Sequence, residues 1–136
     1  MRSISHFFAR LLVAIPILLL HPAVEAAPAA TATITLEVEI RDHAGKVDRV
    51  IRLGIAVDPQ GPPSELKTRI EDAYYRIQVR SLPSGAYAFE IERAGSDRTH
   101  DLRVSATRTL VPKQRGLIGR VARADGSHTE VAATLR

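Results

Sequence analysis

The sequence contains no cysteine and no tryptophan. Without cysteine there is no disulfide, no thiol nucleophile, no sulfur-based zinc site and no cysteine that could accept a lipid. Aromatic residues make up only 4% of the chain, so base stacking on interleaved aromatic rings, and with it nucleic-acid binding, is not expected. A Gly-x-Ser-x-Gly nucleophile motif is also missing. We therefore predict a protein that is not an enzyme, carries no cofactor and is held together by packing alone.

Long apolar runs are missing except near the N-terminus. Arg2 and Arg10 accompany an apolar run over residues 11–20, which as a helix would be about 15 Å long, roughly half the hydrocarbon thickness of a membrane. Val24 and Ala26 then supply the small side chains that a signal peptidase requires before its cleavage point. The segment predicts a signal peptide over residues 1–26 that is cleaved, and no stable membrane span afterwards.

The predicted cleavage leaves residues 27–136 as the mature chain. We interpret residues 27–31 as a flexible leader and residues 32–136 as a single domain. The signal peptide removes two of the 19 basic and one of the 15 acidic residues, so the mature net charge is 17 − 14, or +3. We predict a periplasmic or secreted location.

Apolar and polar residues alternate with period two through most of the mature chain, which is typical of half-buried antiparallel strands. The apolar positions of the six clearest stretches are 34, 36, 38 and 40; 51, 53, 55 and 57; 75, 77 and 79; 87, 89 and 91; 102, 104 and 106; and 131, 133 and 135. Residues 64–71 fit either a strand or a two-turn helix capped by Ser64, and the β-branched Thr68 and Ile70 favour the strand. In the adjacent tyrosines, Tyr75 is expected in the core and Tyr74 outside.

Glycine, proline, aspartate and serine separate these stretches at residues 43–46, 59–63, 83–85, 94–97 and 125–127, where chain reversals are expected. Asp125-Gly126 is the strongest of these hairpin signals. The count is seven or eight strands spaced about twelve residues apart. We predict an all-β fold, an antiparallel β-sandwich of immunoglobulin-like size, with an up-and-down β-barrel as the alternative.

Three histidines remain in the mature chain, and each lies near a predicted reversal. They are the candidate metal ligands, His43, His100 and His128. The nearest two are 28 residues apart in sequence, so they converge only if their three reversals share one end of the sandwich. Around "ADGSHTE", residues 124–130, His128 and Glu130 are expected two positions apart on the outer face of the last strand. Solvated polar residues are the simpler interpretation of all three histidines.

Arginine dominates the basic residues, and residues 93–124 carry eight basic against two acidic side chains. We name five of them as candidate anion-binding or partner-binding residues, Arg103, Arg108, Arg115, Arg120 and Arg123. The five-residue spacing of 93, 98, 103 and 108 would send successive side chains to opposite faces of a strand, which argues against one basic stripe.

Paired carboxylates at 37 and 39 and at 90 and 92 are expected to form ion pairs with Arg76 and Arg80 on neighbouring strands. Taken together, these features favour a non-catalytic interaction or accessory module of the periplasm. Its partner would be another envelope or secreted protein, with an anionic surface as a second option. The alternatives are a secreted hydrolase inhibitor and a weak histidine-based metal-binding protein.

Overall fold

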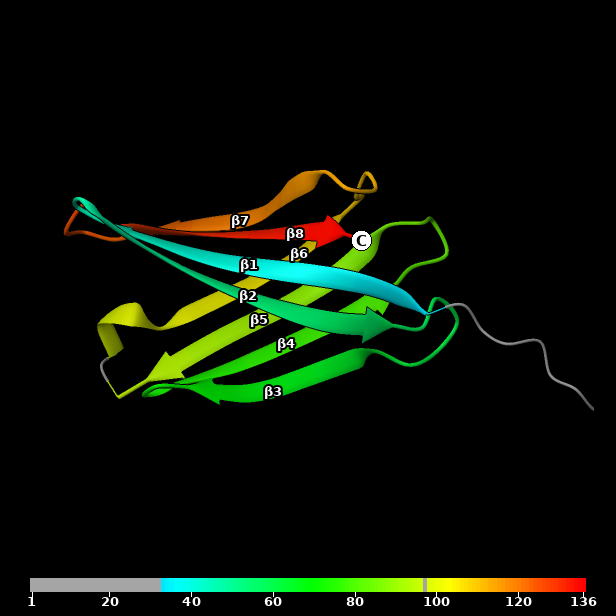
Figure 1. Ribbon diagram of the computed structural model, residues 1–136, viewed down its shortest axis with the longest axis horizontal. Helices are drawn as coiled ribbons and strands as arrows, with labels where there is room; N and C mark the ends of the chain where they lie inside the picture. Colours follow the sequence, from blue (N-terminus) through cyan, green and yellow to red (C-terminus); the bar gives the residue numbers. More distant parts are fainter. Residues whose placement is uncertain (1–32, 97) are drawn as a thin grey trace, which may run out of the picture. The chain divides into compact units, whose positions relative to one another are not determined.

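The computed structural model describes residues 33–96 and 98–136, which contain eight strands and one short 3-10 helix (Figure 1). The predicted signal peptide, residues 1–26, and the predicted leader, residues 27–31, lie outside the described residues. The elements are β1 (Ile34–Ala44), β2 (Val47–Val57), β3 (Ser64–Ile70), β4 (Ala73–Ser81), β5 (Tyr87–Gly95), η1 (Arg98–His100), β6 (Leu102–Arg108), β7 (Arg115–Ala122) and β8 (His128–Leu135).

The strands form two antiparallel sheets of four, in the orders β2-β1-β8-β7 (sheet A) and β3-β4-β5-β6 (sheet B). Figure 1 shows the two sheets as layers that face each other, with β8 central in sheet A between β1 and β7. The predicted antiparallel β-sandwich is therefore confirmed. The last strand of the chain is not an edge strand, and the edges of sheet A are β2 and β7.

The alternative of an up-and-down barrel is wrong. Strands follow one another in chain order around the domain, but in its described part no ladder joins β2 to β3 or β6 to β7. The connection from β2 to β3 contains Pro59, Pro62 and Pro63, which cannot donate hydrogen bonds to a ladder. The connection from β6 to β7 is hydrogen-bonded to sheet A at Lys113, whose N–H donates to the carbonyl of Leu135 at the end of β8 (2.8 Å). The chain therefore passes from sheet A to sheet B between β2 and β3, and returns to sheet A between β6 and β7.

The core lies between the sheets and is made by the predicted inward positions of the alternating stretches. The largest fully buried side chains in it belong to Tyr75 and Phe89. Burial of each large aliphatic or aromatic side chain contributes about 1.5–3 kcal/mol. Tyr74 is 60% exposed and Tyr75 is 1% exposed, as predicted for this pair. Residues 64–70 form a strand, which was the favoured interpretation.

Strand β1 extends four residues beyond its apolar series. The alternation of Leu36, Val38 and Ile40 ends in Asp42, yet pairing with β2 continues to Ala44 opposite Val47. The reversal consists only of Gly45 and Lys46, with Gly45 at a φ of 65° that glycine adopts without strain. His43 therefore lies within a strand, and the prediction that it belongs to a turn is wrong.

Candidate functional site

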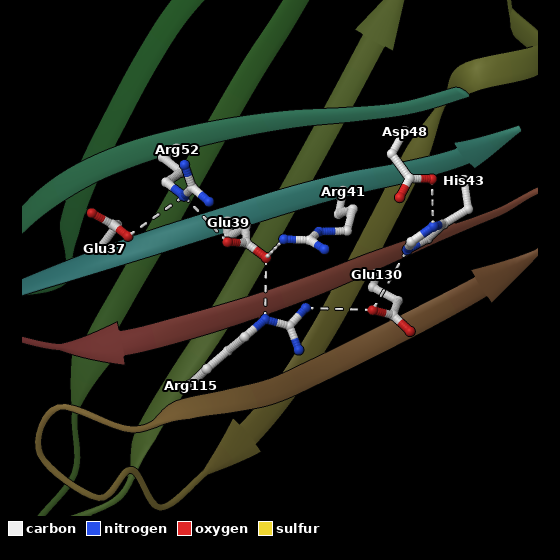
Figure 2. Close-up of polar contacts among 8 residues, drawn as sticks. All are labelled: Glu37, Glu39, Arg41, His43, Asp48, Arg52, Arg115 and Glu130. Carbon is white, nitrogen blue, oxygen red and sulfur yellow. Dashed lines mark hydrogen bonds and ion pairs between the residues drawn. The ribbon is translucent and has the colours of Figure 1, made fainter. Parts of the chain in front are cut away.

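The outer face of sheet A carries a continuous network of charged side chains (Figure 2). Strand register brings its members together, because Glu39 faces Arg52 on β2, while Arg41 faces Glu130 and His43 faces His128 on β8. Odd-numbered residues of β1 share this face because side chains alternate along a strand. The network therefore crosses four strands, from β2 through β1 and β8 to Arg115 on β7.

Glu39 is the centre of this network. Its carboxylate lies 3.1 Å from Nε of Arg115, 3.3 Å from Nε of Arg52 and 3.4 Å from Nη2 of Arg41. These neighbours leave Glu39 only 9% exposed although it is on the outer face. Burial by itself would raise the pKa of Glu39, but the hydrogen bond and charge of Arg115, together with Arg41 and Arg52, lower that pKa below its usual value. The carboxylate is held ionised at neutral pH.

The predicted partners of the paired carboxylates are only partly right. Glu37 and Glu39 lie in sheet A, whereas Arg76 and Arg80 lie in sheet B, so the expected pairs between them do not form. Glu37 instead pairs with Arg136 and Arg52. In sheet B, Arg76 does pair with Glu92, opposite it on β5, at 3.6 Å.

Two of the three candidate histidines meet. His43 and His128 are opposite each other in the β1–β8 ladder, and their rings stack with centroids 4.4 Å apart and an interplanar angle of 22°. Nδ1 of His43 is hydrogen-bonded to Asp48 on β2 (2.8 Å), and Nε2 is 3.8 Å from Oε2 of Glu130. Within the described residues, His43, His128 and Glu130 form the one group of three whose ligand atoms are close enough to share a metal ion.

His100 lies in η1 and is not a member of this group. Its backbone carbonyl accepts a hydrogen bond from Nε of Arg93 (2.8 Å), and Arg93 in turn binds Asp42 on the inner side of β1. The reversals around residues 43, 100 and 128 therefore share one end of the sandwich, as their convergence required. His100 nevertheless contacts the buried Arg93 through its backbone carbonyl and is itself exposed, whereas the histidine pair lies on the outer face of sheet A.

A polar network fills the interior at this end of the sandwich. Arg93, 4% exposed, donates from Nη1 and Nη2 to the two carboxylate oxygens of Asp42, at 2.7 and 2.9 Å. Thr129 donates to the same carboxylate and accepts from Nη2 of Arg123. Burial alone would raise the pKa of Asp42, but the hydrogen bonds from Arg93 and Thr129 lower it below its usual value.

Beside this network is a cavity of about 240 Å³ that opens between β2 and the β4–β5 end of sheet B. Four charged side chains contribute to its lining, those of Arg49, Asp72, Asp42 and Arg93. Arg49 also bridges the sheets, with Nη2 2.7 Å from the Glu71 carboxylate in the β3–β4 turn. Each of these charged side chains thus has a polar partner: Asp42 and Arg93 bind each other, Arg49 binds Glu71, and Asp72 accepts from the Ser96 hydroxyl.

The five candidate arginines do not form one surface. Arg115 and Arg120 are on β7 of sheet A, and Arg115 is occupied by Glu39 and Glu130. Arg103 is on β6 of sheet B, where it pairs with Glu92 at 3.5 Å. Arg123 binds Thr129, and Arg108 donates to the backbone carbonyl of Thr107. The basic character of residues 93–124 is divided between the two sheets and the interior.

The interior network was not among the predictions from the sequence, although the alternation of the strands carries a signal for it. Asp42 continues the inward series of Leu36, Val38 and Ile40, and Arg93 continues that of Phe89 and Ile91. Thr129 likewise precedes the inward Val131. Polar residues in the inward phase of three strands indicate a shared buried polar site at one end of a sandwich.

No protein-family model matches this chain, and no significant match was found among curated proteins or solved structures. Among the described residues, no helix has both the length and the apolar character needed to cross a membrane. Inferences about function therefore rest on the residues and their geometry.

Proposed function

We propose that this protein is an exported, non-catalytic accessory domain that binds another envelope or secreted protein by adding a strand to the edge of β2. The proposal of export rests on the signal-peptide pattern of residues 1–26. The proposal of binding rests on β2, since an edge strand offers unpaired backbone groups to a partner strand.

Strand β2 is the best suited of the four edge strands. It is 11 residues long and pairs with β1 over its whole length without a break in register. The other edge of sheet A, β7, has a bulge between Leu117 and Gly119, which disrupts a pairing surface. The edges of sheet B, β3 and β6, are only seven residues each.

Exposure along β2 supports the same choice. Its first four residues, Val47–Val50, are all exposed, whereas its last residue, Val57, is fully buried beside the crossing to β3. The exposed part includes two apolar side chains, Val47 and Val50. Asp48 and Arg49 lie between them, so a partner strand would meet both apolar and charged side chains there.

The binding proposal is tested by photo-crosslinking in an envelope extract. A benzophenone side chain at position 50 should crosslink to a discrete partner, and Val50→Lys in the unlabelled protein should abolish competition for that partner. Leu117→Lys is the matched control, because Leu117 is an exposed apolar residue (49%, against 36% for Val50) on the opposite edge of the same sheet. Loss of competition in the Leu117 variant but not in the Val50 variant would contradict binding at β2.

The export proposal is tested separately. The full chain, produced in a Gram-negative host, should be recovered from the periplasmic or secreted fraction with a mass that begins at residue 27. A cytoplasmic product that keeps residues 1–26 would refute export. The remaining prediction, inhibition of a hydrolase, becomes an outcome of the crosslinking experiment: a hydrolase as the captured partner would give the accessory domain an inhibitory role.

A further inference from the structure

Strand pairing places two imidazoles and a carboxylate together on the outer face of sheet A. His43 and His128 are opposite each other across β1 and β8, and Glu130 follows two residues later on the same face of β8. Figure 2 shows the His43 ring directed toward Glu130 between the two strands. Two imidazole nitrogens and one carboxylate oxygen are a common three-residue ligand set for zinc, and nitrogen and oxygen ligands also suit copper.

A second carboxylate orients the first ligand. Asp48, opposite His43 on β2, is hydrogen-bonded to Nδ1 at 2.8 Å. Because an ionised carboxylate can only accept, this bond fits the neutral ring with its proton on Nδ1, and Nε2, 3.8 Å from Oε2 of Glu130, is then the nitrogen that can bind an ion. Such carboxylate–histidine contacts are what hold metal-binding imidazoles in position in known sites. Asp48 therefore fixes the orientation of the His43 ring, as the carboxylate behind a metal-binding histidine does in a metal centre.

The spacing requires only side-chain rotation to receive an ion. The three ligand atoms lie within 4.8 Å of one another, and tetrahedral ligands with metal bonds of 2.0–2.2 Å lie about 3.4 Å apart. The His43 and Glu130 side chains are 24% and 26% exposed, so each has room to rotate and an ion can reach them. Both lie on regular strands, which fix the backbone positions of the ligands.

The neighbouring arginine does not block the site. Nη2 of Arg115 is 3.4 Å from Oε2 of Glu130, but Nε of the same guanidinium binds Glu39 at 3.1 Å. If Glu130 turned to an ion, Arg115 would keep its stronger partner. The positive charge of Arg115 would nevertheless oppose a cation at this site and weaken its binding.

We propose that His43, His128 and Glu130 bind one late first-row divalent cation, Cu²⁺ or Zn²⁺, with water completing its coordination. This inference goes beyond strand addition at β2 and does not depend on it. Copper is expected to bind more tightly than zinc, because a nitrogen and oxygen site follows the general order of divalent-metal affinities.

The test is calorimetric titration of the full chain, purified without a polyhistidine tag, with CuCl₂ and with ZnCl₂. We expect one site with a dissociation constant below about 10 μM for at least Cu²⁺. His43→Asn and His128→Asn should each weaken it at least tenfold, and Glu130→Gln should weaken it measurably. His100→Asn is the matched control and should leave the constant unchanged, because His100 is outside the cluster.

A second measurement needs no variant and so does not depend on the folding of one. Substoichiometric Cu²⁺ should broaden the imidazole proton resonances of His43 and His128 before those of His100. Affinity weaker than about 10 μM for both ions, equal broadening of His43, His100 and His128, or an equal loss of affinity in His100→Asn would each overturn the proposal. An unchanged constant in Glu130→Gln would overturn the assignment of the carboxylate.

Discussion

At the scale of single residues, two carboxylates of β1 show how position in the pleat decides the partner. Glu39 points outward and gathers three arginines around it, while Asp42 points inward and binds one arginine through both oxygens. Arg93, the partner of Asp42, has a side chain that is only 3% exposed, so neither charge is well solvated. Loss of one member of such a pair leaves the other buried without compensation.

Asp42→Asn should therefore lower the free energy of unfolding by about 2–3 kcal/mol. The amide keeps an acceptor for Thr129 but no longer balances the charge of Arg93. Urea unfolding followed by far-UV circular dichroism measures the change. Glu71→Gln is the control, because it breaks the exposed Arg49–Glu71 pair and should cost less than about 1 kcal/mol. Equal losses in the two variants would contradict a special role for the buried pair.

At the scale of elements, the contact between β7 and β6 depends on glycine. A Cβ added at Gly119 would lie 2.8 Å from Cγ1 of Val104 on β6, whose branched side chain has little freedom to move away. At Gly116 the nearest atom is Cδ2 of Leu110, the end of a more flexible side chain. The sheets approach closely at β7 because these two positions carry no side chain.

Gly119→Ala should lower the free energy of unfolding by about 1–2 kcal/mol through overpacking. In a chain that already carries Val104→Ala, the same Gly119→Ala change should cost less than it does in the unaltered chain. The smaller side chain at position 104 makes space for the new methyl group. Gly54→Ala on β2 is the control, since its added Cβ meets nothing within 4 Å, and we expect no loss there. Additive losses in the Gly119–Val104 double variant, measured by thermal unfolding, would rule out this contact as the cause.

The elements themselves were largely predictable, because period-two alternation is a local property of the sequence. The Asp125-Gly126 reversal is confirmed: Gly126 has a φ of 86°, and its N–H donates to the carbonyl of Arg123. The shared outer face of His128 and Glu130 followed from the same alternation. The meeting of His43 with His128 was not predictable, because it depends on the pairing of β1 with β8, which are the first and last strands of the described chain.

At the scale of the whole molecule, acid should destabilise the fold. Among the described residues, four carboxyl groups, those of Glu39, Asp42, Glu65 and Asp125, have a pKa below the usual value in the folded state. At pH values above about 5 they are largely ionised in both states, so their contribution is essentially fully present. Below that value the unfolded chain takes up protons first, and the contribution is lost as the pH falls through the folded-state pKa values.

The free energy of unfolding should therefore be flat with respect to these groups from pH 7 to about pH 5 and then decline toward pH 3. Urea titrations at a series of pH values measure the decline. Asp42→Asn should be less stable at pH 7 and show a shallower decline, because one of the four groups no longer titrates. A decline of unchanged steepness in that variant would show that Asp42 does not contribute to it.

The pairing of β1 with β8 also has a consequence for the order in which the chain can assemble. Sheet B is a meander of consecutive strands contained within residues 64–108, but sheet A needs both ends of the domain. The ladder from Leu36–Leu135 to His43–His128 closes only after the C-terminal strand is available. Contacts between such distant residues form slowly, typically in milliseconds to seconds. During translation, sheet A therefore cannot close until β8 has left the ribosome, and β1 lacks its second neighbouring strand until then.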